Sequence, residues 1–134
     1  MPLSLAVAPW AATSQLPTEV VGSAPGVIHC WTRARLPYDF QYGGTWHTAF
    51  SGDMGCDGGW DDAFIRITAQ WLYGSWVNVQ TESRAGLYAG TYLDKGFTRE
   101  CQAATWRTRA YGQVYHGNIL NMTEYSNSVN IDCK

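Results

Sequence analysis

Hydrophobic and polar residues alternate along most of the chain after residue 26, and a period of two is typical of strands that bury one face. The alternation is clearest in residues 63–71, where Ile65 and Ile67 share one side and Phe64 and Arg66 share the other. Glycine-rich turns separate such stretches, and no segment has a convincing helical period. The strands predicted in this way cover residues 27–36, 45–51, 63–71, 76–81, 87–93, 103–115 and 129–133. We therefore expect an all-β fold, an antiparallel β-sandwich of about seven strands.

Three stretches between these strands are expected to be irregular. Residues 52–61 contain four glycines and three aspartates, a composition that predicts a loop. Residues 73–75 and 94–96 each contain a glycine next to polar residues and are predicted to be turns.

Residues 1–26 differ from the rest and are predicted to form an extended N-terminal arm, followed by a sandwich domain of residues 27–134. The arm holds four of the five prolines, and proline cannot donate a hydrogen bond within a central strand. It is also more apolar than a linker would be, so we expect it to dock on a partner protein. Its predicted partner-binding residues are Leu3, Leu5, Val7 and Trp10.

The first residues also resemble the end of an export signal. Ala6, Val7 and Ala8 have the small-x-small pattern of a signal-peptidase site, although no basic residue precedes them. Residues 1–8 are therefore either a remnant of an export signal or part of the mature protein. Both interpretations point to a secreted, extracellular protein.

Four cysteines lie far apart in the sequence, without the close spacing of a zinc or redox motif. Two disulfides in a small secreted domain are expected instead. Four cysteines allow three connectivities, and we favour the two pairs that join sequence neighbours. These pairs are Cys30–Cys56 and Cys101–Cys133.

The chain carries few charges and many aromatic side chains. Charged residues make up 15% of the sequence, against about 25% in average soluble domains, and the formal net charge is −2. No basic field therefore favours nucleic acid or an anionic membrane. No apolar run reaches the roughly 18–20 residues of a membrane span. The seven tryptophans and eight tyrosines are typical of a protein with a binding surface, although for any single ring we favour a place in the sandwich core.

An acidic cluster in residues 52–61 is a weak calcium candidate, because carboxylates spaced by glycines can supply oxygen ligands. The three aspartates concerned are Asp53, Asp57 and Asp61. The alternative is a solvated turn in which these aspartates cap backbone amides. No cofactor is expected, and no nucleophile or zinc motif is present, so we expect no catalytic activity.

One row of the predicted strand 103–115 is both polar and aromatic, whereas the opposite row begins with Trp106. Rings combined with arginine are typical of surfaces that bind a protein or a glycan. The alternative is an ordinary solvent-facing row with cross-strand tyrosine pairs. The predicted binding residues of this row are Arg107, Arg109, Tyr111 and Tyr115.

Several short motifs resemble those of small secreted actinobacterial proteins with two disulfides. They include Phe50-Ser51-Gly52 before Cys56, the strand that ends in Trp71-Leu72-Tyr73, and the terminal run from Ser128 to Cys133. Within that group the chain resembles the adaptor subunit of umbrella toxin particles. Such an adaptor joins a lectin subunit to the stalk of a large toxin chain, with an extended N-terminal segment docked in the lectin.

The resemblance implies a secreted, non-catalytic adaptor in a multiprotein toxin complex, with a lectin subunit and a large toxin chain as partners. Two alternatives stay open. The composition is equally compatible with a free-standing carbohydrate-binding module that takes a glycan, and a small disulfide-tied β protein can also be a secreted inhibitor.

Overall fold

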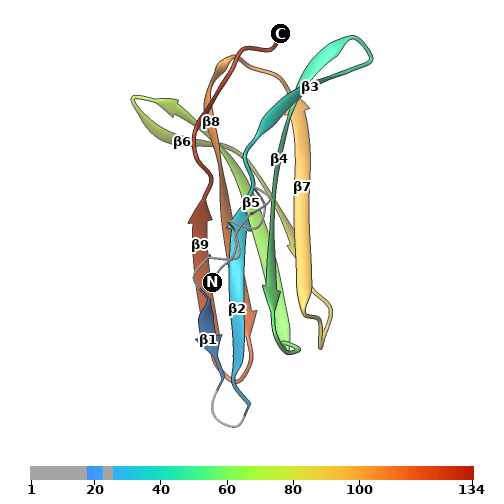
Figure 1. Cartoon of the computed structure of the whole chain (residues 1–134), viewed down its shortest axis with the longest axis vertical. Helices are drawn as coiled ribbons and strands as arrows, with labels where there is room; N and C mark the ends of the chain where they lie inside the picture. Colours follow the sequence, from blue (N-terminus) through green and yellow to red (C-terminus); the bar gives the residue numbers. More distant parts are fainter. Residues whose placement is uncertain (1–17, 23–25) are drawn as a thin grey trace, which may run out of the picture.

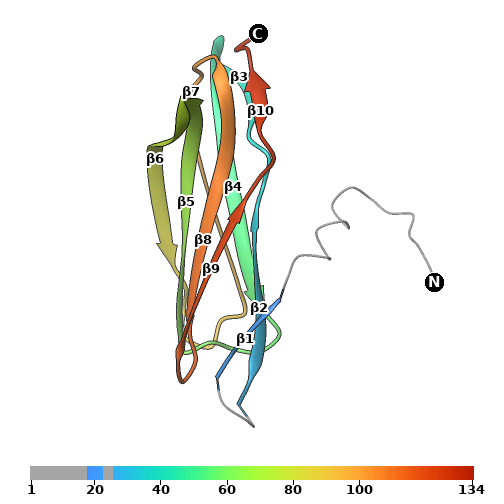
Figure 2. The same cartoon turned by 90° about the vertical axis from the view of Figure 1, so that its left-hand side faces the viewer.

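The computed structural model describes residues 18–22 and 26–134, which form two antiparallel sheets packed face to face (Figures 1 and 2). The expected all-β sandwich is confirmed, with ten strands in the described residues rather than about seven. In chain order the strands are β1 (Glu19–Val21), β2 (Ile28–Ala34), β3 (Tyr38–Tyr42), β4 (Thr45–Cys56), β5 (Asp62–Tyr73), β6 (Ser75–Ala85), β7 (Tyr92–Glu100), β8 (Ala104–Tyr115), β9 (Ile119–Tyr125) and β10 (Val129–Ile131).

The first sheet is built around β4. Strand β7 pairs along one edge of β4, from His47 to Gly55. Strands β2 and β3 share the other edge: β2 pairs with the second half of β4 and β3 with the first half. Pro37 lies between β2 and β3, where its missing N–H ends the ladder. Strand β1 pairs with β2 at the outer edge.

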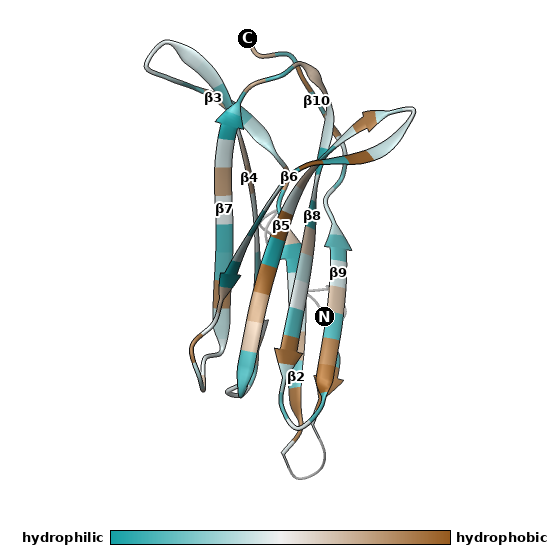
Figure 3. Ribbon diagram, turned by 180° about the vertical axis from the view of Figure 1, so that it is seen from behind, coloured by the Kyte–Doolittle hydropathy of each residue, from teal (hydrophilic) through white to brown (hydrophobic). Residues whose placement is uncertain are grey.

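The second sheet is built around β8 in the same manner. Strand β5 pairs along one edge of β8, while β9 and β10 share the other edge. Strand β6 pairs with β5 through a tight turn at Gly74, whose φ of 74° favours glycine. Bands of hydrophilic and hydrophobic residues alternate along β5, as expected for a strand with one buried face (Figure 3).

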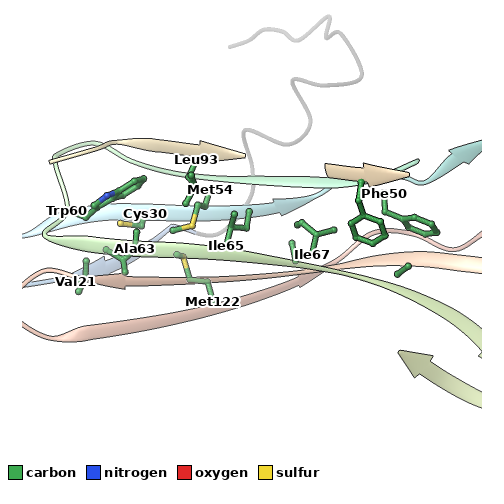
Figure 4. Close-up of a cluster of buried hydrophobic side chains, with 14 of the residues drawn as sticks. Val21, Cys30, Phe50, Met54, Trp60, Ala63, Ile65, Ile67, Leu93 and Met122 are labelled. Atoms are coloured by element: carbon green, nitrogen blue, oxygen red, sulfur yellow. The ribbon is translucent and has the colours of Figure 1, made fainter. Parts of the chain in front are cut away.

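The core lies between the two sheets and is formed by their inward rows (Figure 4). Ile65 and Ile67 of β5 face Met54 of β4, and all three are buried. Burying one large apolar side chain contributes about 1.5–3 kcal/mol. The fully or largely buried apolar residues are Val21, Ile28, Cys30, Phe50, Met54, Trp60, Ala63, Ile65, Ile67, Ala69, Leu93, Phe97, Trp106, Ala110, Val114, Met122 and Ile131.

The start of the sandwich differs from the expected boundary at residue 26. Glu19–Val21 form β1, and Val21 is only 1% exposed, so this part of the predicted arm belongs to the sheet and its core. As an edge strand of three residues, β1 tolerates a sequence that a central strand would not.

The predicted loop at residues 52–61 is wrong in its first half, because β4 continues to Cys56. The glycines there allow close packing rather than a turn. A Cβ on Gly52 would lie 2.6 Å from the carbonyl oxygen of Arg33, and one on Gly55 would lie 2.6 Å from the ring of Trp31.

The predicted strand at 87–93 and the predicted turn at 94–96 are also wrong. Strand β7 starts at Tyr92 and passes through residues 94–96, which pair with β4. Strands β3 and β9 were not predicted, because both are short and carry many exposed or half-exposed residues.

Both favoured disulfides are confirmed. Cys30 and Cys56 lie directly opposite each other in β2 and β4, with their Cα atoms 4.0 Å apart. Cys101 follows β7 and Cys133 follows β10, so their disulfide joins the first sheet to the second. Closing loops of this size contributes roughly 3–4 kcal/mol each in the chain-entropy model.

Candidate binding face on the second sheet

The outward row of β8 carries the predicted binding residues. Trp106, Thr108 and Ala110 are buried against the first sheet, whereas Arg107 and the residues at every second position after it face outward and are partly or largely exposed. The structure thus places all four predicted residues of this strand on one surface. They are Arg107, Arg109, Tyr111 and Tyr115.

Neighbouring strands complete this surface through their register with β8. Arg66 of β5 lies opposite Tyr111, and Tyr125 of β9 lies opposite Arg109. We call this surface the arginine face. Its members are Asp62, Phe64, Arg66, Trp76, Arg107, Arg109, Tyr111, Gln113, Tyr115, Asn121 and Tyr125.

Arg107 is held between two aromatic rings. Its guanidinium carbon lies 4.2 Å from the ring centre of Trp76 and 4.2 Å from that of Tyr125. Its Nε donates a hydrogen bond to Oε1 of Gln70 at 2.8 Å, and Gln70 in turn donates to Asn78 at 2.7 Å. The side chain is therefore fixed in orientation, while its two terminal nitrogens donate no hydrogen bond within the described residues.

Arg66 is held by a second aromatic pair. Its guanidinium carbon lies 5.3 Å from the ring centre of Phe64 and 5.5 Å from that of Tyr111, and these two rings are 5.7 Å apart. Tyr111 is itself fixed, because its hydroxyl donates to Oδ1 of Asn121 and accepts a hydrogen bond from Gln113 at 3.2 Å. The rings therefore position guanidinium groups.

Arg109 lies between these two clusters along β8. In the part of the chain that the structure describes, its guanidinium has no carboxylate, hydrogen-bond or ring partner. The opposite residue on β5 is Thr68, whose hydroxyl is occupied by Thr81 at 3.0 Å.

The end of the face near Tyr115 has a different character. A shallow pocket there is lined by Asp62, Ala63, Phe64, Gln113 and Tyr115. Asp62 starts β5 and is the one carboxylate among the outward positions of the four described strands of this face. Formal charge on the face is therefore +2, from three arginines and one aspartate, while the whole chain carries −2.

The sequence identified only the β8 row of this face. Phe64 and Arg66 were already placed on the outward side of their strand, but the register that sets them beside Tyr111 was not predictable from alternation. Trp76 lay in a predicted strand without an assigned partner. Tyr125 belongs to β9, which was not predicted.

The calcium candidates are not brought together, and each aspartate has different partners. Asp53 accepts hydrogen bonds from Arg33 at 2.9 and 2.7 Å and from Arg35 at 2.8 Å. Asp57 accepts from the backbone N–H of His29 at 2.8 Å, and this bond is the main reason why its pKa is lowered. Asp61 lies 3.5 Å from Nδ1 of His116. Within residues 18–22 and 26–134, no three acidic, histidine or cysteine side chains form a metal-binding group.

Asp53 instead forms the centre of a cluster on the outer side of the first sheet. The hydroxyl of Tyr92 also donates to it at 2.7 Å, and the carboxylate is fully buried beneath its partners. The hydrogen bond to Asp53 raises the pKa of Arg33, and burial raises the pKa of Tyr92. The sequence does not predict this cluster, because the glycines and aspartates of residues 52–61 are typical of a loop.

A loop at residues 86–91 presents two apolar side chains to solvent. Leu87 is 85% exposed and Tyr88 is 79% exposed. The loop is fastened to the buried ring of Trp60, whose Nε1 donates to the carbonyl oxygen of Leu87 at 2.8 Å. Ala89 has a φ of 61°, which is unusual for a residue with a side chain.

The predicted arm residues Leu3, Leu5, Val7 and Trp10 lie outside the described residues. The described residues contain no helix of the length and apolarity needed to cross a lipid bilayer. No protein-family model gives a significant match to this chain, and neither a curated protein sequence nor a solved structure does so.

Proposed function

We propose that the protein is a secreted, non-catalytic adaptor that holds a partner protein on its arginine face. The observation that carries this proposal is Arg107, fixed between Trp76 and Tyr125 with its terminal donors unused. Fixing a guanidinium in advance reduces the entropy lost when a partner binds. Arginine and aromatic residues are also the types enriched at protein interfaces, where lysine and glutamate are depleted.

An adaptor needs a second docking element, and the N-terminal arm is our proposal for it. The arm would dock a lectin subunit, and the sandwich would contact a larger toxin-type chain. Support for this division comes from the sequence resemblance and from the apolar composition of residues 1–17. Strand β1, which follows them, lies in the first sheet, whereas the arginine face is the outer side of the second. Two partners could therefore bind without competing for one surface.

Export from the cell is part of the same proposal. Two disulfides are typical of oxidising compartments and rare in the cytosol. They agree with a secreted protein.

A neutral-glycan module is a weaker alternative for this face. Sugar rings stack on exposed aromatic faces, but here guanidinium groups already lie against Trp76, Tyr125, Phe64 and Tyr111. Tyr115 is 45% exposed and lies beside the shallow pocket, and Tyr125 is 49% exposed. A glycan array with hits that are lost in Tyr115→Ala would favour this alternative.

The inhibitor alternative is favoured by one observation, the fastened loop that exposes Leu87 and Tyr88. Chymotrypsin-like proteases accept such side chains in a hydrophobic pocket. Inhibition of chymotrypsin that disappears in a Leu87→Gly, Tyr88→Gly variant would support it, and an unchanged protease rate with the wild-type protein would remove it.

Co-purification tests the adaptor proposal. Tagged wild-type protein is exposed to the culture medium of the producing organism, and bound proteins are quantified by mass spectrometry. We expect a stoichiometric protein partner that is lost with Arg107→Ala, Arg109→Ala and retained with Arg84→Ala. The proposal would be contradicted if the protein is recovered alone, or if the double variant retains the partner as well as the wild type does.

A further inference from the structure

We infer that the arginine face binds a row of carboxylates on an extended, acidic protein segment. This inference rests on the proposed function and names the chemistry of the partner. Its basis is the juxtaposition of Arg107, Arg109 and Arg66 on the outer face of one sheet with unused guanidinium donors.

The donors of these three side chains point to an anionic ligand. Among the described residues, none of the three forms an ion pair with a carboxylate, whereas Arg33, Arg35 and Arg84 all do so. Arginine presents a planar fork of donors that matches a carboxylate with two parallel hydrogen bonds. The same fork also matches phosphate, but carboxylates are the anionic groups that an unmodified protein segment carries on its side chains.

The distribution of charge supports the same ligand. The chain is acidic overall, with a formal charge of −2, yet this face is positive. Its single carboxylate, Asp62, lies at the end of β5 beside Tyr115, away from Arg107. An acidic segment laid over the three arginines therefore meets attraction along most of its length.

The spacing of the arginines matches an extended peptide. Arg107 and Arg109 are two positions apart on β8, which separates them by about 7 Å. Arg66 lies opposite Tyr111, so it is the diagonal neighbour of Arg109 at about 7–8 Å. Side chains on one side of an extended peptide repeat every ~7 Å, so acidic residues at alternate positions meet successive arginines.

The aromatic rings argue against a neutral ligand at the same place. The guanidinium groups of the two held arginines occupy one side of each neighbouring ring, where a sugar or a planar apolar group would otherwise stack. What the face offers to a ligand is therefore positive charge and N–H donors, with the rings as supports.

Binding of defined peptides tests the inference. The probe is a fluorescent twelve-residue peptide of alternating Glu and Thr, compared with one of alternating Gln and Thr, by fluorescence anisotropy at low salt. We expect the Glu peptide to bind at least tenfold more tightly and to weaken as salt is raised. Equal binding of the two peptides, or no binding of the Glu peptide at millimolar concentration, would overturn the inference.

Matched variants separate this face from general charge attraction. Arg109→Gln and Arg84→Gln both remove one positive charge, but Arg84 lies on β6 and pairs with Asp94 of β7. We expect Arg109→Gln to lower the affinity for the Glu peptide at least fivefold. Arg84→Gln should change this affinity less than twofold. Equal losses would show non-specific attraction and overturn the inference.

Two further measurements address other occupants. The first is binding of polygalacturonate. If it binds more tightly than the Glu peptide and Arg109→Gln weakens that binding, the ligand of the face is an acidic polysaccharide, and the inference of a protein segment is overturned. The second is analytical ultracentrifugation. A dimer of the wild type that is lost in Arg109→Gln would mean that the face binds a second copy of this chain, which would also overturn the inference. If the peptide fails while a co-purified partner still depends on Arg107 and Arg109, the adaptor proposal stands and only the acidic segment is wrong.

Discussion

Asp53 and Arg33 lie directly opposite each other in β4 and β2, on the outer side of the first sheet. Nε of Arg33 donates to one carboxylate oxygen of Asp53 and a terminal nitrogen donates to the other, at 2.9 and 2.7 Å. The carboxylate is fully buried although it points away from the core, because Arg33, Arg35 and Tyr92 cover it. A buried charge with this many donors is costly to remove on its own.

We therefore expect Asp53→Ala to lower the free energy of unfolding by about 2–4 kcal/mol, since it leaves two guanidinium groups and a tyrosine hydroxyl without their acceptor. Urea denaturation followed by tryptophan fluorescence measures this loss. Asp94→Ala is the control, because its ion pair with Arg84 is exposed and should be worth about 1 kcal/mol or less. Similar losses of unfolding free energy in the two variants would show that the burial of Asp53 does not add to the stability that its ion pairs provide.

Gly112 of β8 should not tolerate a side chain. A Cβ there would lie 2.6 Å from Oγ1 of Thr32 and 3.3 Å from the sulfur of Met54. We expect Gly112→Ala to destabilise the protein by about 1–3 kcal/mol, as overpacking does in close-packed cores. The double variant Gly112→Ala, Thr32→Ala removes the nearest obstacle, so its loss should be smaller than the sum of the single losses. Strictly additive losses would contradict the clash with Thr32.

Glu124 gives the fold a dependence on pH. Burial raises the pKa of this carboxyl, and the nearby Glu19 raises it further. Its folded form therefore prefers the proton more than its unfolded form does, so folding stability falls as pH rises from the unfolded pKa of 4.5 through the raised folded value.

We accordingly expect Glu124→Gln to raise the melting temperature at pH 7 and to leave it almost unchanged at pH 3.5, where Glu124 is protonated in both states. Differential scanning fluorimetry across this range measures the difference. Asp132→Asn serves as a control for the loss of a negative charge. An equal rise at both pH values would attribute the effect to something other than titration.

The disulfide between the sheets should matter for stability. We expect Cys101→Ser, Cys133→Ser to lose roughly 3–4 kcal/mol, because a 32-residue separation is no longer closed in the unfolded chain. Urea denaturation of the oxidised wild type and the double variant gives the comparison. A loss below about 1 kcal/mol would mean that packing between the sheets alone holds the C-terminal segment.

Alternation was sufficient to predict the fold class, since rows such as Ile65 and Ile67 fix which face of a strand is buried. It failed where glycine occurs inside a strand. Gly52 and Gly55 look like turn residues in the sequence, yet they allow close contacts with β2, β5 and β8. Strand β9 was missed because it is a mostly exposed edge strand with weak alternation.

The candidate site was predictable only along one strand. The outward row of β8 followed from alternation, and its arginines and tyrosines were identified in that way. The two aromatic pairs that hold Arg107 and Arg66 depend on the registers of β5, β6 and β9 with their neighbours. Register depends on turn geometry as well as on the hydrophobic pattern, and alternation within one strand does not tell which residues lie opposite it.

Strand β1 and the C-terminus lie at opposite ends of the sandwich (Figure 1). In the arrangement that we propose, a pull between a partner on the N-terminal arm and one on the arginine face would load the pairing of β1 with β2. Only three residue pairs join β1 to β2, whereas a covalent bond ties Cys133 to the end of β7. We therefore expect the β1 edge to yield first under load and the rest of the sandwich, with the arginine face, to keep its shape after β1 has separated.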